Sequence, residues 1–85
     1  MYQITFKKSA AKEIEKLPST VIKRIAPIID DLANDPKPSG SKKLAAQKEN
    51  LWRIRIGDYR VVYLIEETIK IVEIRRVGHR KDIYK

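Results

Sequence analysis

The segment between residues 51 and 65 constrains the fold more than any other part of the chain, because apolar residues recur at every second position in its first half and a turn signal follows. From residue 52 to residue 56, the apolar residues are Trp52, Ile54 and Ile56, and those between them are Arg53 and Arg55. This alternation is typical of a strand with one buried face. Gly57-Asp58 follows as a two-residue hairpin turn, so Tyr59 to Ile65 is predicted to return as an antiparallel strand.

A two-residue turn determines which side chains of this hairpin lie together. It pairs Ile56 with Tyr59 and Arg55 with Arg60. Three arginines are then predicted to share one face: Arg53, Arg55 and Arg60. The opposite face is the expected packing surface and collects Trp52, Ile54, Ile56, Tyr59, Val61 and Tyr63. We therefore predict that Trp52 is a core residue, although a slip of one residue would exchange the two faces.

The shared arginine face indicates a chemical role, because three like charges on one side of a purely structural sheet would only repel each other. A guanidinium group matches phosphate oxygens with its planar fork and stays charged at physiological pH. The pattern therefore favours a site for a phosphate or for a negatively charged transition state. The alternative is that Glu66 and Glu73 neutralise these arginines as cross-strand ion pairs.

The residues before the hairpin predict one strand and two helices. Tyr2 to Phe6 alternates as a short strand. Ser9 is a candidate N-cap for a helix that ends before Pro18. Ser19 or Thr20 is the candidate cap of a second helix, so the two helices form a hairpin.

The remaining segments complete an α+β fold. Pro27 lies inside the second helix and predicts a kink or a break near Arg24. Asn34 to Lys43 is rich in proline, glycine and serine and is predicted to be a loop. Ile69 to Arg76 is predicted to be the last strand, ended by Gly78. The predicted order is β-α-α-β-β-β, with an N-terminal helical hairpin packed on a small, mainly antiparallel sheet.

Length and charge indicate one domain with an anionic partner. Eighty-five residues are enough for one core, so residues 1–85 are predicted to form a single domain. Nineteen basic and eleven acidic side chains give a net charge of +8. Residues 1–35 hold six basic and five acidic side chains, whereas residues 36–85 hold thirteen and six. The uneven surplus favours an anionic partner on one side, although a basic surface that serves only solubility is the alternative.

Composition also excludes several classes of site. The chain has no cysteine and one histidine, which excludes disulfides, cysteine nucleophiles, cysteine-based zinc sites and multi-histidine metal sites. No apolar run approaches the ~20 residues of a membrane span, and the N-terminus shows no signal-peptide pattern. We therefore expect a cytoplasmic protein with no membrane partner, no metal and no small-molecule cofactor.

Three segments together resemble the RelE branch of the RelE/ParE toxin superfamily. The segments are Trp52 to Tyr63, Val77-Gly78-His79-Arg80 and Ile83-Tyr84. The most specific part is the block from Leu51 to Arg60 together with the Gly-His-Arg-x-x-x-Tyr pattern that begins at Gly78. Leu17-Pro18, Asp35-Pro36 and Lys43-Leu44 also fit the family pattern. The resemblance covers essentially the whole chain and implies a RelE-like toxin of a type II toxin–antitoxin system. It further implies a metal-independent endoribonuclease that cuts mRNA in the ribosomal A site, with a cognate antitoxin, the ribosome and mRNA as partners.

The resemblance also implies site residues. Family catalytic positions fall on Arg53, Arg55, Arg60, Arg80 and Tyr84. The expected contacts to RNA or the ribosome are Lys37, Lys42, Lys43, Arg76 and Lys81. This chain departs from the family in two respects. The positions of Arg53 and Arg55 are often occupied by lysine in RelE. The spacing from Arg80 to Tyr84 is shorter than in some members.

Metal-independent RNA cleavage needs a base for the 2′-hydroxyl, a stabiliser for the phosphorane and an acid for the 5′-oxygen. Arginine suits the second task but exchanges protons poorly. The base or acid is therefore expected among His79, Tyr84 and Lys43. The structural alternatives are a capping or surface role for His79 and packing on the sheet for Tyr84.

Two other functions fit the same features. A ParE-type toxin shares the fold but poisons DNA gyrase, and such toxins generally lack the set formed by Arg80 and Tyr84. A non-catalytic, basic RNA- or ribosome-binding module would bind without cutting.

Overall fold

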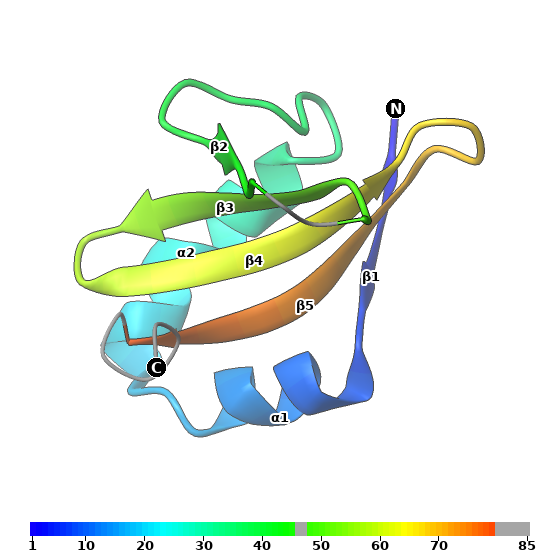
Figure 1. Cartoon of the computed structure of the whole chain (residues 1–85). Coiled ribbons are helices and arrows are strands. Elements are labelled where there is room, and N and C mark those ends of the chain that lie inside the picture. The colour runs from blue at the N-terminus through cyan, green and yellow to red at the C-terminus, as the bar shows by residue number, and fades with distance from the viewer. Residues whose placement is uncertain (46–47, 80–85) are drawn as a thin grey trace.

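The computed structural model describes residues 1–45 and 48–79. Within this part of the chain, two helices and five strands form one α+β unit (Figure 1). The elements in chain order are β1 (Gln3–Phe6), α1 (Lys8–Glu15), α2 (Ser19–Asp31), β2 (Lys42–Lys43), β3 (Leu51–Ile56), β4 (Tyr59–Glu66) and β5 (Ile71–His79). The predicted fold class is confirmed, with β2 as an additional strand inside the segment predicted to be a loop.

The five strands form a single sheet in the order β1-β5-β4-β3-β2. β3 and β4 form the predicted hairpin, with Ile56 opposite Tyr59 and Arg55 opposite Arg60. β4 also pairs antiparallel with β5, whereas β1 pairs with β5 in parallel. The sheet is therefore mainly antiparallel, as predicted, and its first strand lies beside its last.

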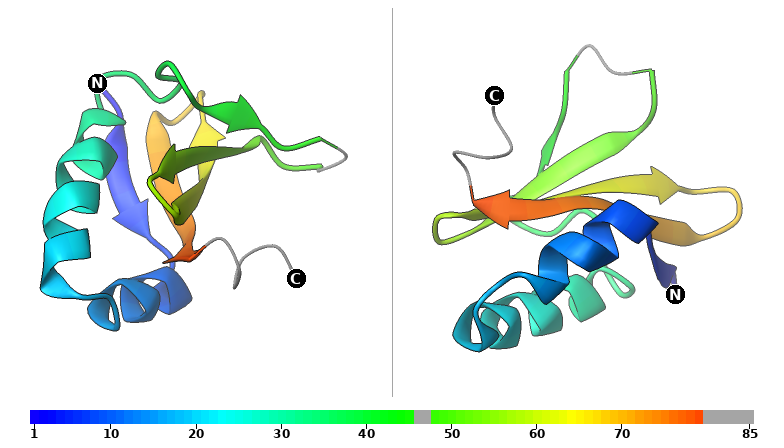
Figure 2. Two further views of the ribbon diagram at one scale, coloured as in Figure 1. Left: turned by 90° about the vertical axis from the view of Figure 1, so that its left-hand side faces the viewer. Right: turned by 90° about the horizontal axis from the view of Figure 1, so that it is seen from below.

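Both helices cover the same face of the sheet, and the opposite face carries no helix (Figure 2). The core lies between them and contains Ala10, Ile25, Ile29, Leu32, Ile54, Ile56, Val61, Tyr63, Ile65, Val72, Ile74 and Val77. Trp52 and Tyr59 pack against it. The alternation read from the sequence therefore assigns the hairpin's buried face correctly, and Trp52 is a packing residue as predicted. No helix in residues 1–45 or 48–79 is both long and apolar enough to span a membrane.

The predicted helix caps are wrong. α1 begins at Lys8, because the Lys7 amide still donates to the Ile74 carbonyl in the sheet and the chain turns into the helix at the next residue. Ser9 therefore lies inside the helix. α2 is preceded by Pro18, whose carbonyl accepts from the backbone N–H of Val21 and of Ile22, and neither helix has a side-chain cap.

The sequence predicted a kink or a break near Arg24. The break does not occur, because α2 is continuous from Ser19 to Asp31 with Pro27 inside it. Proline removes one backbone hydrogen bond from the helix. On either side of it, Ile25 and Ile29 are 2% and 3% exposed and anchor the helix to the core. Packing on both sides of Pro27 thus compensates for one missing hydrogen bond.

β5 is longer than predicted and contains a bulge. It passes through Gly78 to His79, because Gly78 pairs with Arg60 and His79 pairs with Tyr59. The register shifts between Val62 and Tyr63 of β4, so Arg75 is an extra residue in β5. Arg75 therefore has no partner residue in β4, and Arg76 is opposite Val62.

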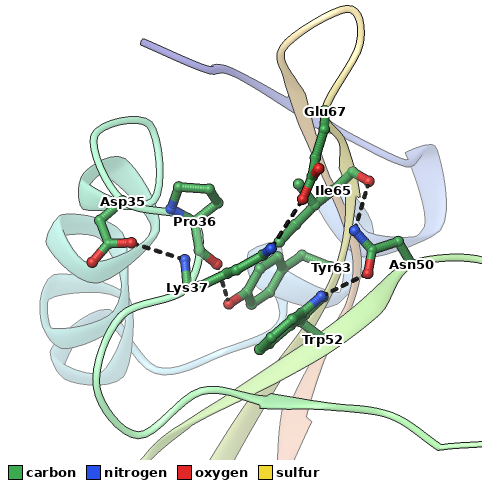
Figure 3. Close-up of polar contacts among 8 residues, drawn as sticks. All are labelled: Asp35, Pro36, Lys37, Asn50, Trp52, Tyr63, Ile65 and Glu67. Carbon is green, nitrogen blue, oxygen red and sulfur yellow. Dashed lines mark hydrogen bonds and ion pairs between the residues drawn. The ribbon is translucent and has the colours of Figure 1, made fainter.

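Polar contacts attach the connections on either side of β2 to the sheet (Figure 3). The buried Tyr63 hydroxyl donates to the Pro36 carbonyl at 2.7 Å, and burial raises the pKa of Tyr63 to about 12. The Trp52 indole N–H donates to the Asn50 side-chain oxygen at 2.9 Å. The Asn50 amide in turn donates to the Ile65 carbonyl at 3.3 Å. Pro36 and Asn50 are therefore fixed relative to β3 and β4.

Candidate functional site

The sheet face opposite the helices presents charged residues in rows, and we call it the arginine face. Residues directly opposite each other in neighbouring strands place their side chains on the same face. The row nearest the Gly57 turn contains Arg55, Arg60 and Gly78. The next row contains Lys42, Arg53, Val62 and Arg76. Three predicted catalytic residues, Arg53, Arg55 and Arg60, therefore share this face as expected.

Two of these arginines are buried, which the sequence did not predict. Arg53 is 8% and Arg60 is 5% exposed, whereas Arg55 is exposed. The Arg60 guanidinium donates from Nη1 to the Tyr59 carbonyl at 3.4 Å. Charged side chains are rarely buried this deeply, because burial removes their hydration. Arg53 and Arg60 are therefore positioned by the fold, which is the preorganisation that electrostatic catalysis requires.

The described acidic residues do not form the ion pairs with Arg53 and Arg55 that the alternative to a phosphate site requires. Glu73 forms an ion pair with Arg75, the extra residue of the bulge. Glu49 also binds Arg75, with Nη2–Oε2 and Nη1–Oε1 distances of 2.9 and 3.2 Å. In residues 1–45 and 48–79, none of the ion pairs includes Arg53 or Arg55.

This arrangement divides the face into two regions. Around Arg75, charges are balanced, and its guanidinium lowers the pKa of Glu49 through a hydrogen bond and its charge. The two carboxylates in return raise the pKa of Arg75, with the hydrogen bond to Glu49 as the largest cause. Nearer the Gly57 turn, neither Arg53 nor Arg55 has an ion pair among the residues described, so this is the part of the face suited to an anionic ligand.

The three predicted RNA-binding lysines near β2 lie in different places. Lys42 is opposite Arg53 and therefore on the arginine face. Lys43 is opposite Trp52 and therefore on the other face. Lys37 forms an ion pair with Glu67 at 2.9 Å, and its ammonium lies 5.4 Å from the centre of the Trp52 ring (Figure 3). Of these three residues, the arrangement brings only Lys42 to the predicted catalytic arginines.

His79 and Arg76 are also directed away from the arginine cluster. His79 is opposite Tyr59, and their rings meet edge to face with centroids 5.5 Å apart. This pairing places His79 on the helix-covered side, where it lines a pocket of about 380 Å³. Arg76 extends its guanidinium to Glu13 of α1, with an Nη2–Oε2 distance of 3.3 Å.

The predicted residues Arg80, Lys81 and Tyr84 lie outside the residues that the structure describes. β5 leads directly to them, and its last described residues, Gly78 and His79, pair with Arg60 and Tyr59 at the start of β4. The proposed roles of Arg80, Lys81 and Tyr84 therefore remain predictions from the sequence.

Glu13 is a residue of structural importance that sequence reasoning missed. Its Oε1 accepts from the Val77 backbone N–H at 3.0 Å, while Oε2 binds Arg76. β1 pairs with β5 only as far as Ile74, so Glu13 supplies an acceptor at an edge that β1 no longer covers. The sequence contained no signal for this contact, because it joins elements far apart in the chain. In the described parts of the chain, no three His, Cys, Asp or Glu side chains are grouped as a metal site would require.

Comparisons with a family model, with curated proteins and with solved structures all match this chain to toxins. A family model described as the ParE toxin of the type II toxin–antitoxin system parDE matches residues 4–84. Toxin RelG of Mycobacterium tuberculosis is 32% identical over 85 residues, covering 99% of this chain and 97% of that protein. RelE in the RelE–RelB complex of Pyrococcus horikoshii superposes with a TM-score of 0.81 at 29% identity, covering 93% and 94% of the two chains. The intact E. coli RelBE complex gives 0.82 at 26% identity, covering 93% and 96%.

Proposed function

Because the chain belongs to the RelE/ParE superfamily of type II toxins, in its RelE-type branch, we propose that it is a ribosome-dependent mRNA endoribonuclease. In this proposal the arginine face binds the mRNA backbone in the ribosomal A site and cleaves it without a metal. Its action on ribosomes places the protein in the cytoplasm.

The observation that carries this proposal is the fixed position of Arg53 and Arg60 beside the exposed Arg55. Guanidinium groups held on one face can bind a phosphate and stabilise the extra negative charge of a phosphorane. Their burial means that little reorganisation is needed when that charge develops. The arrangement suits the binding of a substrate whose geometry is supplied by the ribosome.

The proposed reaction requires two proton transfers. The 2′-hydroxyl loses its proton and its oxygen bonds to phosphorus, while the bond from phosphorus to the 5′-oxygen breaks and that oxygen takes up a proton. The products are a 2′,3′-cyclic phosphate and a 5′-hydroxyl. We assign phosphate binding to Arg60 and Arg80, and one proton transfer to Tyr84. Lys37, Lys43 and His79 are not assigned to this machinery, because their contacts and register place them away from the arginine face.

The direct test compares naked RNA with mRNA in a programmed ribosome. The parent protein should cleave mRNA in the ribosome efficiently and naked RNA negligibly, because the protein's own acid–base groups are sparse. Tyr84→Phe and Arg80→Ala should each lower single-turnover cleavage by ~10²-fold or more. Equal rates on naked and ribosome-bound RNA would contradict ribosome dependence. Parent-rate cleavage by Tyr84→Phe would contradict its proton role.

Arg60 needs a more careful test than an exposed arginine, because at 5% exposure its truncation also removes packing. Arg60→Lys keeps a positive charge and most of the side-chain volume but lacks the planar fork. We expect Arg60→Lys to stay folded, by circular dichroism, and to lose cleavage nearly as completely as Arg60→Ala. A fully active Arg60→Lys would show that charge is sufficient there.

A cognate antitoxin is the proposed protein partner. The structural relatives include toxin–antitoxin complexes from an archaeon and from E. coli. An antitoxin segment with acidic residues could cover the arginine face and compensate its positive charge. Hydrogen exchange of the complex should then protect β3 and β4, whereas protection limited to the exposed sides of the helices would contradict this placement.

The second candidate is gyrase poisoning, which the ParE description of the matching family model favours. A supercoiling and cleavage assay with DNA gyrase distinguishes the two activities. Gyrase inhibition without mRNA scission would support the ParE function. Ribosome binding with neither activity would support a non-catalytic binding module.

A further inference from the structure

Lys42 is the lysine that the sheet register adds to the arginine face. β2 pairs antiparallel with β3 and places Lys42 directly opposite Arg53 and Lys43 opposite Trp52. Side chains at opposed positions project from the same face, with Cβ atoms ~5 Å apart. Consecutive residues of one strand project to opposite faces. Two adjacent lysines of equal charge are therefore separated by the sheet itself.

The surroundings of the two lysines differ accordingly. On its face, Lys43 contributes to lowering the pKa of Glu67, after the larger effects of Lys37 and Lys70. In residues 1–45 and 48–79, neither of the two exposed side chains, Lys42 and Lys43, takes part in a hydrogen bond or an ion pair, so what distinguishes them is the face on which each lies. The neighbour of Lys42 across the strands is the buried Arg53. Lys42 thus extends the positively charged surface from β4 and β3 to the edge strand β2.

We propose that the Lys42 ammonium contacts an RNA phosphate next to the one held by the arginines. This inference rests on the proposed function and names a substrate-contacting residue for it. An ammonium group meets phosphate as a compact charge on a flexible stem, so it suits a contact at the rim of a site built from fixed guanidinium groups. Arg53 and Arg55 of β3 are both arginines, and Lys42 of the neighbouring strand β2 adds an ammonium group.

The test uses Lys42→Met and Lys43→Met, which remove the same charge from adjacent positions on opposite faces. Both side chains are exposed, so both variants should fold, as urea unfolding will show. Single-turnover cleavage of mRNA in programmed ribosomes is measured against enzyme concentration at several salt concentrations. Lys42→Met should raise the half-saturating concentration ~3- to 10-fold and reduce the salt slope by about 0.7 to 1. Lys43→Met should change both much less, and Lys42→Arg should restore binding.

Equal effects of Lys42→Met and Lys43→Met would overturn the inference, because net charge rather than position would then be responsible. A larger effect of Lys43→Met would also overturn it. If the parent protein cleaves no ribosome-bound mRNA, the proposed nuclease function has failed. The contact is then tested separately by equilibrium binding of the same variants to a single-stranded RNA oligonucleotide. A selective loss with Lys42→Met supports the contact in that case, and equal losses reject it.

Discussion

Replacing Arg55 with glutamine should stabilise the protein while impairing cleavage. Arg55 lies opposite Arg60 and two residues from Arg53 on the same face, and it has no acidic partner among the residues described. Two unit charges ~6 Å apart repel by about 0.7 kcal/mol in water. Like charges opposed across strands typically cost up to ~1 kcal/mol. We therefore expect Arg55→Gln to raise the free energy of unfolding by ~0.5 to 1 kcal/mol.

Thermal and urea unfolding at low and high salt will measure this effect. For a domain of this size, the expected gain corresponds to a rise in Tm of about 2 to 8 °C. It should shrink in ~1 M salt, where charges on the surface are screened. Single-turnover cleavage should fall by ~10²-fold or more if Arg55 stabilises the transition state.

Arg76→Gln is the matched control, because it removes the same charge from a residue that binds Glu13. It should leave stability unchanged or lower it by up to ~1 kcal/mol, as expected for a largely exposed ion pair. If Arg55→Gln lowers stability as well, or if its gain is independent of salt, repulsion on the arginine face is not the cause.

Three other substitutions test separate features of the fold. Tyr63→Phe should lower stability by ~1 to 2 kcal/mol at neutral pH, since a buried hydrogen bond is lost. The pKa of Tyr63 is raised to about 12 in the folded protein, whereas in the unfolded state the phenol begins to ionise near pH ~10. The extra stability of the parent over Tyr63→Phe should therefore be complete below pH ~10 and decrease up to pH 12. A stability difference in urea unfolding that stays constant over this range would contradict the reasoning. Gly57→Ala should lower the free energy of unfolding by ~1 kcal/mol, because Gly57 has a φ of +62° and an added Cβ would lie 3.0 Å from the Arg24 guanidinium. An unchanged Tm would show that the turn adapts. Glu13→Ala should lower stability by ~1 to 3 kcal/mol, and equal costs for Glu13→Ala and for Glu15→Ala on the same helix would show that the contact with β5 is unimportant.

The parts of the fold that were predictable depend on local patterns. Alternation and the Gly57-Asp58 turn together determine the register of β3 and β4, so the grouping of Arg53, Arg55 and Arg60 followed from the sequence. The helices were predictable for the same reason, because the spacing of apolar residues marks the face that packs on the sheet. Their starting points were not, since backbone hydrogen bonds to distant strands determine where α1 begins.

The parts that were missed depend on contacts between distant segments. The bulge at Arg75 brings this arginine into an ion pair with Glu73, a contact that the sequence did not predict. The short pairing of Lys42 and Lys43 with β3 cannot be read from two residues of sequence. Burial of Arg53 and Arg60 runs against the usual exposure of charged residues, and such exceptions are expected where a sheet is shaped for a ligand rather than for stability.

The position of β5 in the sheet has a consequence during synthesis of the protein. Among the strands of residues 1–45 and 48–79, β5 is made last, yet it lies between β1 and β4, so Gln3 can pair with Ile71 only after the whole segment between them has been synthesised. Until then β1 lacks the strand that it pairs with in the described sheet, and the β3–β4 hairpin lacks its neighbour β5. Contacts between such distant residues also form slowly, because closing a long loop is entropically costly. A growing chain therefore carries its arginines before the sheet that holds them in place is complete.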